Sequence, residues 1–299
     1  MSARSRFRLF KFPVKNQLHR FTRSKFGSFL FFVILISGGL FSVLPLVYCI
    51  TTSFKPLDEL LIFPPTLFTV KRPTIANYTA IPDLLSGLSV PITRYAFNSI
   101  FVSIIGTFLS VIISAMAAFV LSKTEMKFNK LIFTVVQFSL LFNAYTLSVP
   151  QYIVYSKIGI INTYLAYIVP AAASSMGVFL MKQYMDGYVP YALIEAAHID
   201  GAGWIGIFTR IVLPIVRPCV LTLVMFSFLG IWNSVPSGTI FSESLKTLPT
   251  VMSTIAAGGL ARSGSSMATS VILMIFPIAV YLISQGSIKE TMGSAGIKG

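Results

Sequence analysis

Residues Tyr95–Leu121 read YAFNSIFVSIIGTFLSVIISAMAAFVL, a run without Lys, Arg, Asp or Glu. An α-helix rises about 1.5 Å per residue, so about 20 apolar residues cross the roughly 30 Å hydrocarbon layer of a bilayer. Runs of the same kind, also free of these charges, cover residues 26–50, 131–149, 162–181, 218–240 and 267–288. The sequence therefore predicts an all-α membrane protein with six transmembrane helices.

The composition agrees with this class of protein. Of the 299 residues, 55% are hydrophobic and 11% are charged, whereas soluble domains carry about 25% charged residues. A net charge of +14 would suggest nucleic acid binding in a soluble chain, but here it indicates a biased membrane topology, and we expect no nucleic acid partner. Cys49 and Cys219 fall in or beside apolar runs, so neither a disulfide framework nor a metal site is expected.

The distribution of basic residues predicts the orientation. Most of the 23 Lys and Arg residues lie in the tails 1–25 and 289–299 and in the segments after the second and fourth runs. Because loops rich in Lys and Arg stay in the cytoplasm, both termini should be cytoplasmic. The first run is longer than the core of a signal peptide and no small-residue cleavage site follows it, so we expect it to be retained.

The connecting segments differ in character. The external segment 51–93 is rich in proline and is expected to form an extended strap with short helical pieces. The external segment 241–266 ends in a Gly and Ser cluster, residues 258–266, which predicts flexible backbone at a loop tip. The segment 182–217 is the longest cytoplasmic loop and the most regular in pattern.

The cytoplasmic segment predicts a short helix that ends at Gly201. Pro190 suits a first helical turn, and Gly201 suits a left-handed terminator. A second apolar stretch, Trp204–Val212, should stop at Leu213-Pro214. One face of the first helix carries Leu193, Ala196, Ala197 and Asp200.

This helix has the character of a protein-docking surface. The small side chains of Ala196 and Ala197 would let a partner approach the backbone closely, and Glu195 and Asp200 offer charged contacts at the ends. A helix that lies on a membrane surface favours Lys and Arg on its polar face, whereas this one is acidic. We therefore expect it to dock to a protein.

The spacing of these residues resembles a known family motif. Glu195-Ala196-Ala197, three residues, Gly201-Ala202, an eight-residue gap and then Ile211-x-Leu213-Pro214 is similar to the EAA loop of the membrane subunits of binding-protein-dependent ABC importers. Further features resemble the smaller, six-span permease of the maltose-type carbohydrate uptake family: Ser53-Phe54-Lys55-Pro56, Phe63-Pro64-Pro65, Asn77-Tyr78 and the tail 294–299.

The resemblance implies a transport complex in a bacterial inner (plasma) membrane. Residues 26–288 would be the permease domain, and its partners would be a second homologous permease, two ABC ATPase subunits and an extracellular or periplasmic solute-binding protein. The chain has no G-x-x-x-x-G-K-[ST] loop, so we expect it to hold no nucleotide. The resemblance implies that the chain is a transporter subunit rather than an enzyme, with ATP and Mg held by the partner ATPases. Its ATPase-coupling residues would be Glu195, Ala196, Ala197, Asp200, Gly201, Ala202, Ile211, Leu213 and Pro214.

The candidate substrate path consists of neutral polar and aromatic residues in the runs. Sugars need such hydrogen-bonding and stacking groups, although polar residues in membrane helices often serve as interhelical contacts instead. The loop that would meet the binding protein includes Gly258, Gly259 and Arg262. His198 has no further ligand at metal-binding spacing, so no metal is expected. The candidate path residues are Gln137, Asn143, Tyr145, Trp232 and Asn233.

Two alternatives stay open beside a sugar importer. The same architecture could import another solute, such as polyamine, phosphate or peptide, although a charged solute would favour a buried opposite charge, which the runs lack. A membrane scaffold or receptor subunit could instead use the Glu195 helix for docking without moving solute. The absence of charged residues from the runs disfavours an ion-coupled carrier or a channel.

Overall fold

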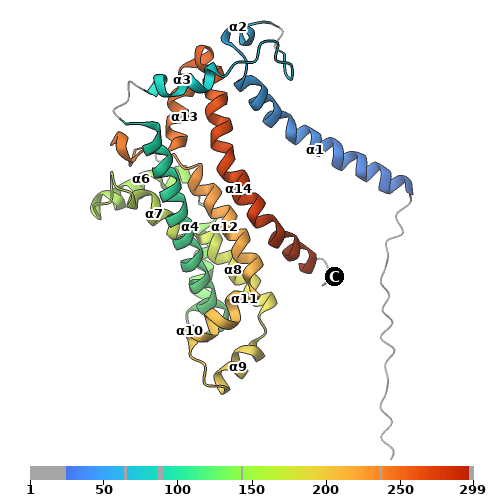
Figure 1. The fold of residues 1–299 in the computed structure, drawn as a ribbon. Helices are drawn as coiled ribbons and strands as arrows, with labels where there is room; N and C mark the ends of the chain where they lie inside the picture. Colours follow the sequence, from blue (N-terminus) through green and yellow to red (C-terminus); the bar gives the residue numbers. More distant parts are fainter. Residues whose placement is uncertain (1–24, 64–65, 86–89, 143, 236–237, 296–299) are drawn as a thin grey trace, which may run out of the picture. The chain divides into compact units, whose positions relative to one another are not determined.

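The computed structural model describes residues 25–63, 66–85, 90–142, 144–235 and 238–295. All regular structure in these ranges is helical, which confirms the all-α prediction. The chain divides into two compact units, Met1–Val47 and Tyr48–Gly299. The helices, shown in Figure 1, are α1 (Lys25–Ser53), α2 (Leu57–Leu60), α3 (Ala76–Leu85), α4 (Ile92–Lys123), α5 (Asn129–Ser139), α6 (Ala144–Lys157), α7 (Leu165–Ala172), α8 (Ser175–Tyr188), α9 (Tyr191–Ile199), α10 (Trp204–Ile207), α11 (Leu213–Ile215), α12 (Arg217–Trp232), α13 (Leu248–Ala256) and α14 (Ser263–Ala295).

Four helical stretches in the described residues are long and apolar enough to span a membrane: Phe26–Ser53, Ile92–Lys123, Leu165–Tyr188 and Ser263–Gln285. They correspond to four of the predicted runs. A fifth candidate is the pair Trp204–Ile215 and Arg217–Trp232, bent by 82° at Val216. The chain is therefore a multi-pass membrane protein.

The predicted third and fifth runs differ most from the structure. Run 131–149 is divided between α5, which ends at Ser139, and α6, which begins at Ala144. Leu140 and Leu141 form a turn after α5. Ser139, the last residue of α5, donates its hydroxyl to the Ser175 hydroxyl of α8 at 2.7 Å. Run 218–240 is helical only as far as Trp232.

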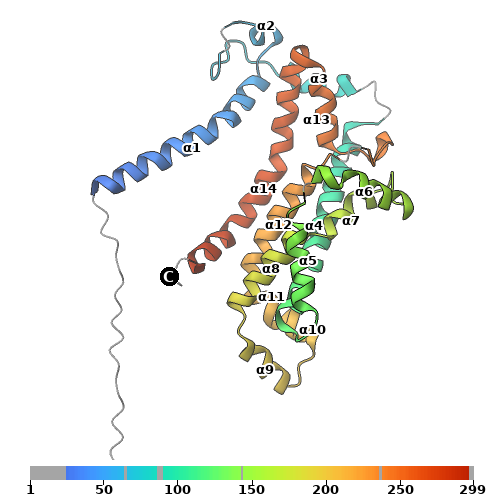
Figure 2. The same cartoon turned by 180° about the vertical axis from the view of Figure 1, so that it is seen from behind.

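Close approach between α4 and its neighbours shapes the bundle (Figures 1 and 2). Helix α4 packs against α7, α8 and α12, and its buried face repeats small residues. A Cβ atom on Gly177 of α8 would overlap the Ser114 hydroxyl and lie 3.0 Å from Ser114 Cβ. Such small residues allow helix backbones to approach closely inside a membrane. The repeat on α4 is Ser99, Ser103, Gly106, Ser110 and Ser114.

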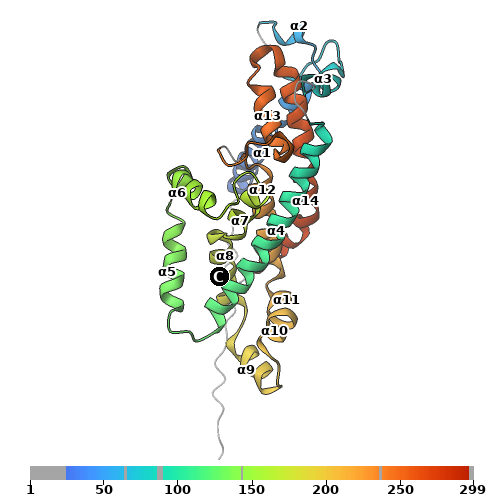
Figure 3. The same cartoon turned by 90° about the vertical axis from the view of Figure 1, so that its left-hand side faces the viewer.

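Two hydrophobic clusters stabilise the ends of this bundle. One joins the C-terminal half of α4 to α8, α9 and the segment α10–α12, with Met181, Met185 and Ile207 fully buried. The other joins the N-terminal part of α4 to α3, α13, α14 and the end of α12, around Tyr95 and Trp232. The ends of the bundle that carry α9 and α13 lie far apart (Figure 3).

The prediction of a flexible Gly and Ser loop tip is wrong for residues 263–266. These residues form the first turn of α14, and Gly264, Ser265 and Ser266 are buried. A Cβ atom on Gly264 would overlap the Asn77 amide, whose Nδ2 donates to the carbonyls of Ser53 and Lys55 at 2.9 and 2.8 Å. The glycine therefore permits close packing onto the strap rather than flexibility.

Candidate functional site

Helix α9 forms at the predicted place and ends by the predicted device. Pro190 precedes its first turn, and Asp200 follows its last. Gly201 has a φ of +78°, its amide donates to the His198 carbonyl at 3.0 Å, and the amide of Ala202 donates to the Ala197 carbonyl at 2.9 Å. This pair of bonds is the Schellman motif, in which a left-handed residue closes the helix.

The two faces of α9 differ from the predicted arrangement in one respect. Ile194 and Ala197 are buried in the hydrophobic cluster of α4 and α8, so Ala197 is not available to a partner. Figure 1 shows α9 beyond the lower ends of α4 and α8. The exposed residues of α9 and its C-cap are Tyr191, Ala192, Leu193, Glu195, Ala196, His198, Ile199 and Asp200. An acidic and apolar surface is thus presented at the tip of the bundle.

The segment after α9 attaches it to the bundle. Pro214 does not stop the helix as predicted, because α10, a π-helical turn at Phe208–Val212 and α11 run continuously to Ile215. The helix ends one residue after Pro214, at Ile215, before the 82° bend. Ile211 and Leu213 pack half-buried against the same cluster as Ile194, while Pro214 is exposed.

Two contacts that the sequence reasoning missed join α9 to α4. The Trp204 ring lies between His198 of α9, at 4.4 Å between ring centroids, and Phe119 of α4, at 6.0 Å. Lys123, the last residue of α4, is buried, and its Nζ donates to the carbonyl of Val189 at 2.8 Å. The same Nζ lies 5.5 Å from the centre of the Tyr191 ring. A lysine at the end of an otherwise uncharged run was the signal for this contact.

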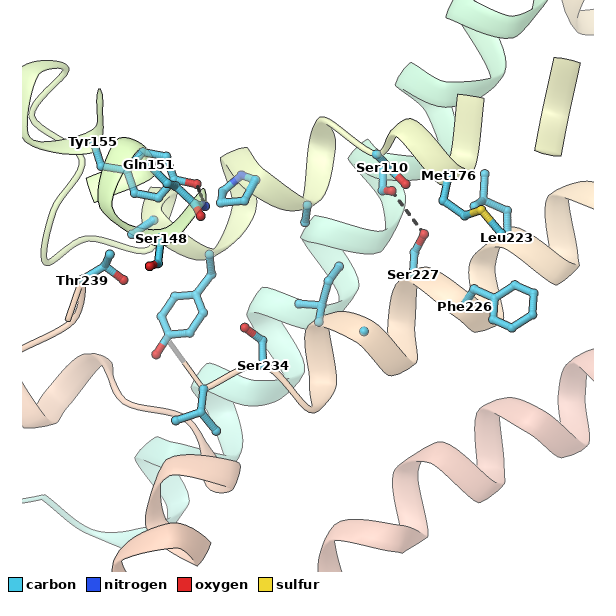
Figure 4. Close-up of a pocket in the computed structure, with 18 residues that line it drawn as sticks. Ser110, Ser148, Gln151, Tyr155, Met176, Leu223, Phe226, Ser227, Ser234 and Thr239 are labelled. Atoms are coloured by element: carbon cyan, nitrogen blue, oxygen red, sulfur yellow. Dashed lines mark hydrogen bonds between the residues drawn. The ribbon is translucent and has the colours of Figure 1, made fainter. Parts of the chain in front are cut away.

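A cavity of 620 Å³ lies between α4, α6, α7, α8 and α12. Figure 4 shows Ser110 and Ser227 on one side and the α6 residues on the other. The Ser110 and Ser227 hydroxyl oxygens lie 3.1 Å apart, and Gln151 donates to the Tyr155 hydroxyl. Among the described residues, the polar lining is neutral and comprises Ser110, Ser148, Gln151, Tyr155, Tyr167, Ser174, Ser227, Ser234 and Thr239.

The predicted path residues do not gather at this cavity. Gln137 is exposed on α5, and Asn233 is exposed after α12, where its Nδ2 donates to the Leu229 carbonyl at 3.0 Å. Trp232 is buried, donates from Nε1 to the Leu273 carbonyl at 3.2 Å, and lies against two Phe rings. Tyr145 lies in α6, and Asn143 lies outside the described residues. The signal missed was Gln151 one helical turn before Tyr155.

The segment that leads from the cavity into the predicted external loop is held by polar contacts. Asn162, with a φ of +60°, accepts from the amides of Phe241 and Ser242 at 3.1 and 2.8 Å. Asn98 of α4 donates to the carbonyls of Ser244 and Lys246, both at 2.8 Å. Asn98 is therefore structural.

Glu243 is the charged centre of this segment. It accepts from the Tyr95 hydroxyl at 2.7 Å and from Lys246 Nζ at 2.5 Å. Partial burial works to raise the pKa of Glu243, but the two hydrogen bonds and the charge of Lys246 outweigh it and hold the pKa below its ordinary value. The carboxylate therefore stays ionised at neutral pH.

The predicted binding-protein residues lie together near the α13–α14 turn. Gly258 and Arg262 are exposed, and Gly259 has a φ of +67°. Among the described residues, no group of His, Cys, Asp and Glu side chains could hold a metal ion. His198 is in contact with Trp204 instead.

Comparison with known proteins places the chain among transporter permeases. No protein-family model matches it. It is 33% identical to the protein LplC of Bacillus subtilis over 207 residues, 67% of this chain and 65% of LplC. It is 29% identical to the sulfoquinovosyl glycerol transport system permease protein SmoH of Agrobacterium fabrum, covering 89% of this chain and 91% of SmoH.

Two further similarities agree. The arabinooligosaccharides transport system permease protein AraQ of Halalkalibacterium halodurans is 29% identical, over 86% of this chain and 92% of AraQ. A chain of a bacterial ABC transporter that imports the acidic polysaccharide alginate superimposes with a TM-score of 0.72 at 17% identity, over 89% of this chain and 99% of that one.

The fold is thus shared with a chain of this bacterial ABC transporter. The chain belongs to the carbohydrate permease family of ABC transporters.

Proposed function

We propose that this chain is a permease subunit of an ABC importer and forms half of the translocation pathway for a carbohydrate. The observation that carries the proposal is the cavity of 620 Å³ between α4, α6, α7, α8 and α12, which is open on the side of the exposed Met176 and Phe226, in a chain whose relatives are carbohydrate permeases. Its volume falls in the range of about 300 to 1,000 Å³ that is usual for ligand sites. Hydroxyl, amide and phenol groups line it, which suit the hydroxyl groups of a sugar.

The solute would be a neutral carbohydrate. The described lining contains no Lys, Arg, Asp or Glu, and an ionised solute in a membrane interior favours an opposite charge. The relatives are named for a charged solute in one case, sulfoquinovosyl glycerol for SmoH, and for a neutral one in another, arabinooligosaccharides for AraQ. The neutral lining favours a neutral solute for this chain.

The exposed face of α9 would be the coupling surface toward a cytoplasmic ABC ATPase. The Schellman end at Gly201, the Trp204 contact and the Lys123 hydrogen bond support this role, because they fix α9 to α4 and α8. ATP and Mg would be bound by two ATPase partners. Closure of the ATPase dimer would then move α9 together with the helices that line the cavity, switching between two packed arrangements.

The topology proposed for the complex has six spans and cytoplasmic termini in a bacterial inner membrane. The α5–α6 pair would supply the third span as a divided one, and the bent pair that includes α12 would supply the fifth. A second permease would complete the pathway, and the α13–α14 turn with Gly258, Gly259 and Arg262 would face a solute-binding protein. These partners follow from the family.

The test is ATPase activity of the reconstituted complex of both permeases, the ATPase and the binding protein, measured against a panel of neutral and acidic oligosaccharides. We expect stimulation by a neutral member of the panel. Stimulation by a uronic acid oligomer alone would overturn the neutral assignment. If the complex assembles and no sugar stimulates it, a non-sugar solute or a scaffold role takes the place of this proposal.

A further inference from the structure

An exposed apolar hook follows the end of α1, between α2 and α3. We define the apolar hook as Leu61, Ile62, Phe63, Leu67 and Phe68. All five residues are at least 48% exposed, and Phe63 is 91% exposed. Such a cluster of large apolar side chains on a loop indicates an interaction surface rather than a core.

The hook is held beside the last turn of α1. The Thr51 hydroxyl donates to the Leu67 carbonyl at 3.1 Å, and Lys55 Nζ donates to the carbonyl and the hydroxyl of Thr66. Thr51 lies within α1, two residues before its last residue, Ser53. The chain therefore leaves the helix, turns at α2 and folds back to the level of the apolar helix end (Figure 1).

The polar side of the same segment is satisfied separately. The Glu59 carboxylate, which is buried, accepts from the amides of Lys71 and Arg72 at 3.0 and 3.3 Å. Asp58 pairs with Arg72, and both side chains are exposed. Charged residues thus precede and follow the hook, and Lys55 is bonded to Thr66 between its residues, but Lys55, Asp58 and Glu59 are each hydrogen-bonded within the strap, which leaves the five apolar side chains of the hook without such partners.

The depth of the hook decides between the possible occupants. The apolar run of a membrane helix ends where hydrocarbon gives way to headgroups, and aromatic side chains are enriched at that level. The apolar run of α1 ends at Ile50, and the next residue, Thr51, is bonded to the Leu67 carbonyl, so the hook lies beside the end of this run. Water is an unfavourable neighbour for these side chains, and lipid is the apolar phase at that depth.

We propose that the apolar hook inserts into the outer boundary of the bilayer and anchors the external strap to lipid. The strap also holds Asn77, which binds the end of α1 and packs against Gly264 of α14. Lipid would therefore fix the level of the strap on which the start of α14 rests. This anchor is independent of the transported solute.

The test places an environment-sensitive fluorophore at the hook. Cys49→Ser and Cys219→Ser give a cysteine-free background, Phe63→Cys is labelled with NBD, and Lys71→Cys on the same strap is the matched control. The chain, purified with its copurifying subunits, is reconstituted in liposomes of phosphatidylethanolamine and phosphatidylglycerol. Quenching is measured with a lipid that carries a doxyl group near the headgroup and with aqueous iodide.

We expect the label at position 63 to emit at shorter wavelength than the label at position 71, to lose emission with the doxyl lipid and to resist iodide. The label at position 71 should show the reverse. Phe63→Trp, read by brominated lipid, repeats the test with an aromatic side chain kept in place. Iodide quenching at position 63 equal to that at position 71 would overturn the proposal.

Protein occupants give other outcomes, and each of them contradicts the lipid anchor. Shielding from both quenchers in the reconstituted complex would show that a neighbouring subunit covers the hook. Iodide access that is lost only when the solute-binding protein is added would make the hook a docking surface for that protein. Neither outcome depends on which sugar, if any, stimulates the ATPase, so a failure here is distinct from a failure of the proposed function.

Discussion

The α9 tip and the central cavity differ in how the sequence forms them. The tip is formed by one continuous stretch of sequence, in which Pro190 precedes the helix and Gly201 ends it. The cavity is assembled from residues of five helices that lie far apart in the sequence, such as Ser110 of α4 and Ser227 of α12. A surface formed by local backbone conformation can therefore be predicted from the sequence, whereas a site formed by the packing of distant helices can be located only once that packing is known.

We expect the largest effect from a substitution that disrupts the packing of α4 against α8, beside the cavity. Gly177→Val places side-chain atoms against Ser114 where even a Cβ overlaps the hydroxyl, and overpacking of this kind costs about 1 to 3 kcal/mol. Thermal unfolding of the purified complex measures this loss of stability as a lower unfolding temperature. Gly187→Val, on the same helix with open space around it, is the control and should leave the unfolding temperature unchanged.

A partial rescue sharpens this prediction. Ser114→Gly combined with Gly177→Val should recover part of the lost stability, because it removes the atoms that collide. Equal instability in the single and double variants would show that the α4–α8 approach is not the cause.

The next largest effect is expected from a substitution that weakens the attachment of the α9 tip to α4. Lys123→Met keeps the aliphatic length but removes the donor to the Val189 carbonyl, and a hydrogen bond from a charged group contributes about 1.5 to 3 kcal/mol. We expect less sugar transported per ATP hydrolysed, measured by paired uptake and phosphate-release assays. Lys130→Met, a lysine beyond the end of α4, is the control. An unchanged ratio in Lys123→Met would remove this residue from coupling.

A smaller effect tests the local end of α9. Gly201→Ala requires a left-handed conformation at a φ of +78°, which costs a non-glycine residue about 1 to 2 kcal/mol. The Schellman end should loosen and coupling should fall while the cavity still binds solute. Gly203→Ala, at a φ of −73° with no neighbour within 4 Å, is the matched control. Equal coupling in the two variants would contradict the account of this turn.

The smallest effect concerns pH and the segment around Glu243. Because the pKa of Glu243 is lowered in the folded protein, its contribution to stability is present above the unfolded-state pKa and is lost as pH falls through the folded-state pKa. Thermal unfolding followed from neutral to acidic pH should show this loss. Glu243→Gln should be less stable at neutral pH and flatter in its acid profile, and a profile parallel to the parent's would refute the assignment.

The sequence predicted the parts of the fold that depend on apolar length and on local turns. Tyr95–Leu121 is a single helix, and α9 ends at a left-handed glycine, as expected. The division of 131–149 was not predicted, because its apolar residues continue across the break at Leu140 and Leu141. Residues 263–266 look flexible by composition, yet Gly264 is needed for contact with Asn77, a partner far away in the chain.

The candidate site, like the fold, was predicted only where it depends on local sequence. The residues at α9 could be placed from the sequence, apart from which alanine faces the core. The cavity could not, because small residues such as Ser110 and Ser227 have no periodic signal that separates helix contact from cavity lining. Trp232 was expected in the path but serves the core, since its Nε1 reaches the Leu273 carbonyl.

ATP-driven uptake of a neutral oligosaccharide into liposomes that contain the complete complex tests the central claim most directly. Uptake is compared between the parent, Ser227→Phe, which fills the cavity from α12, and Ser156→Phe, which adds the same ring at an exposed position of α6. The account predicts uptake in the parent and in Ser156→Phe and its loss in Ser227→Phe while the complex still assembles. Undiminished uptake in Ser227→Phe would contradict the claim that this cavity is the solute path.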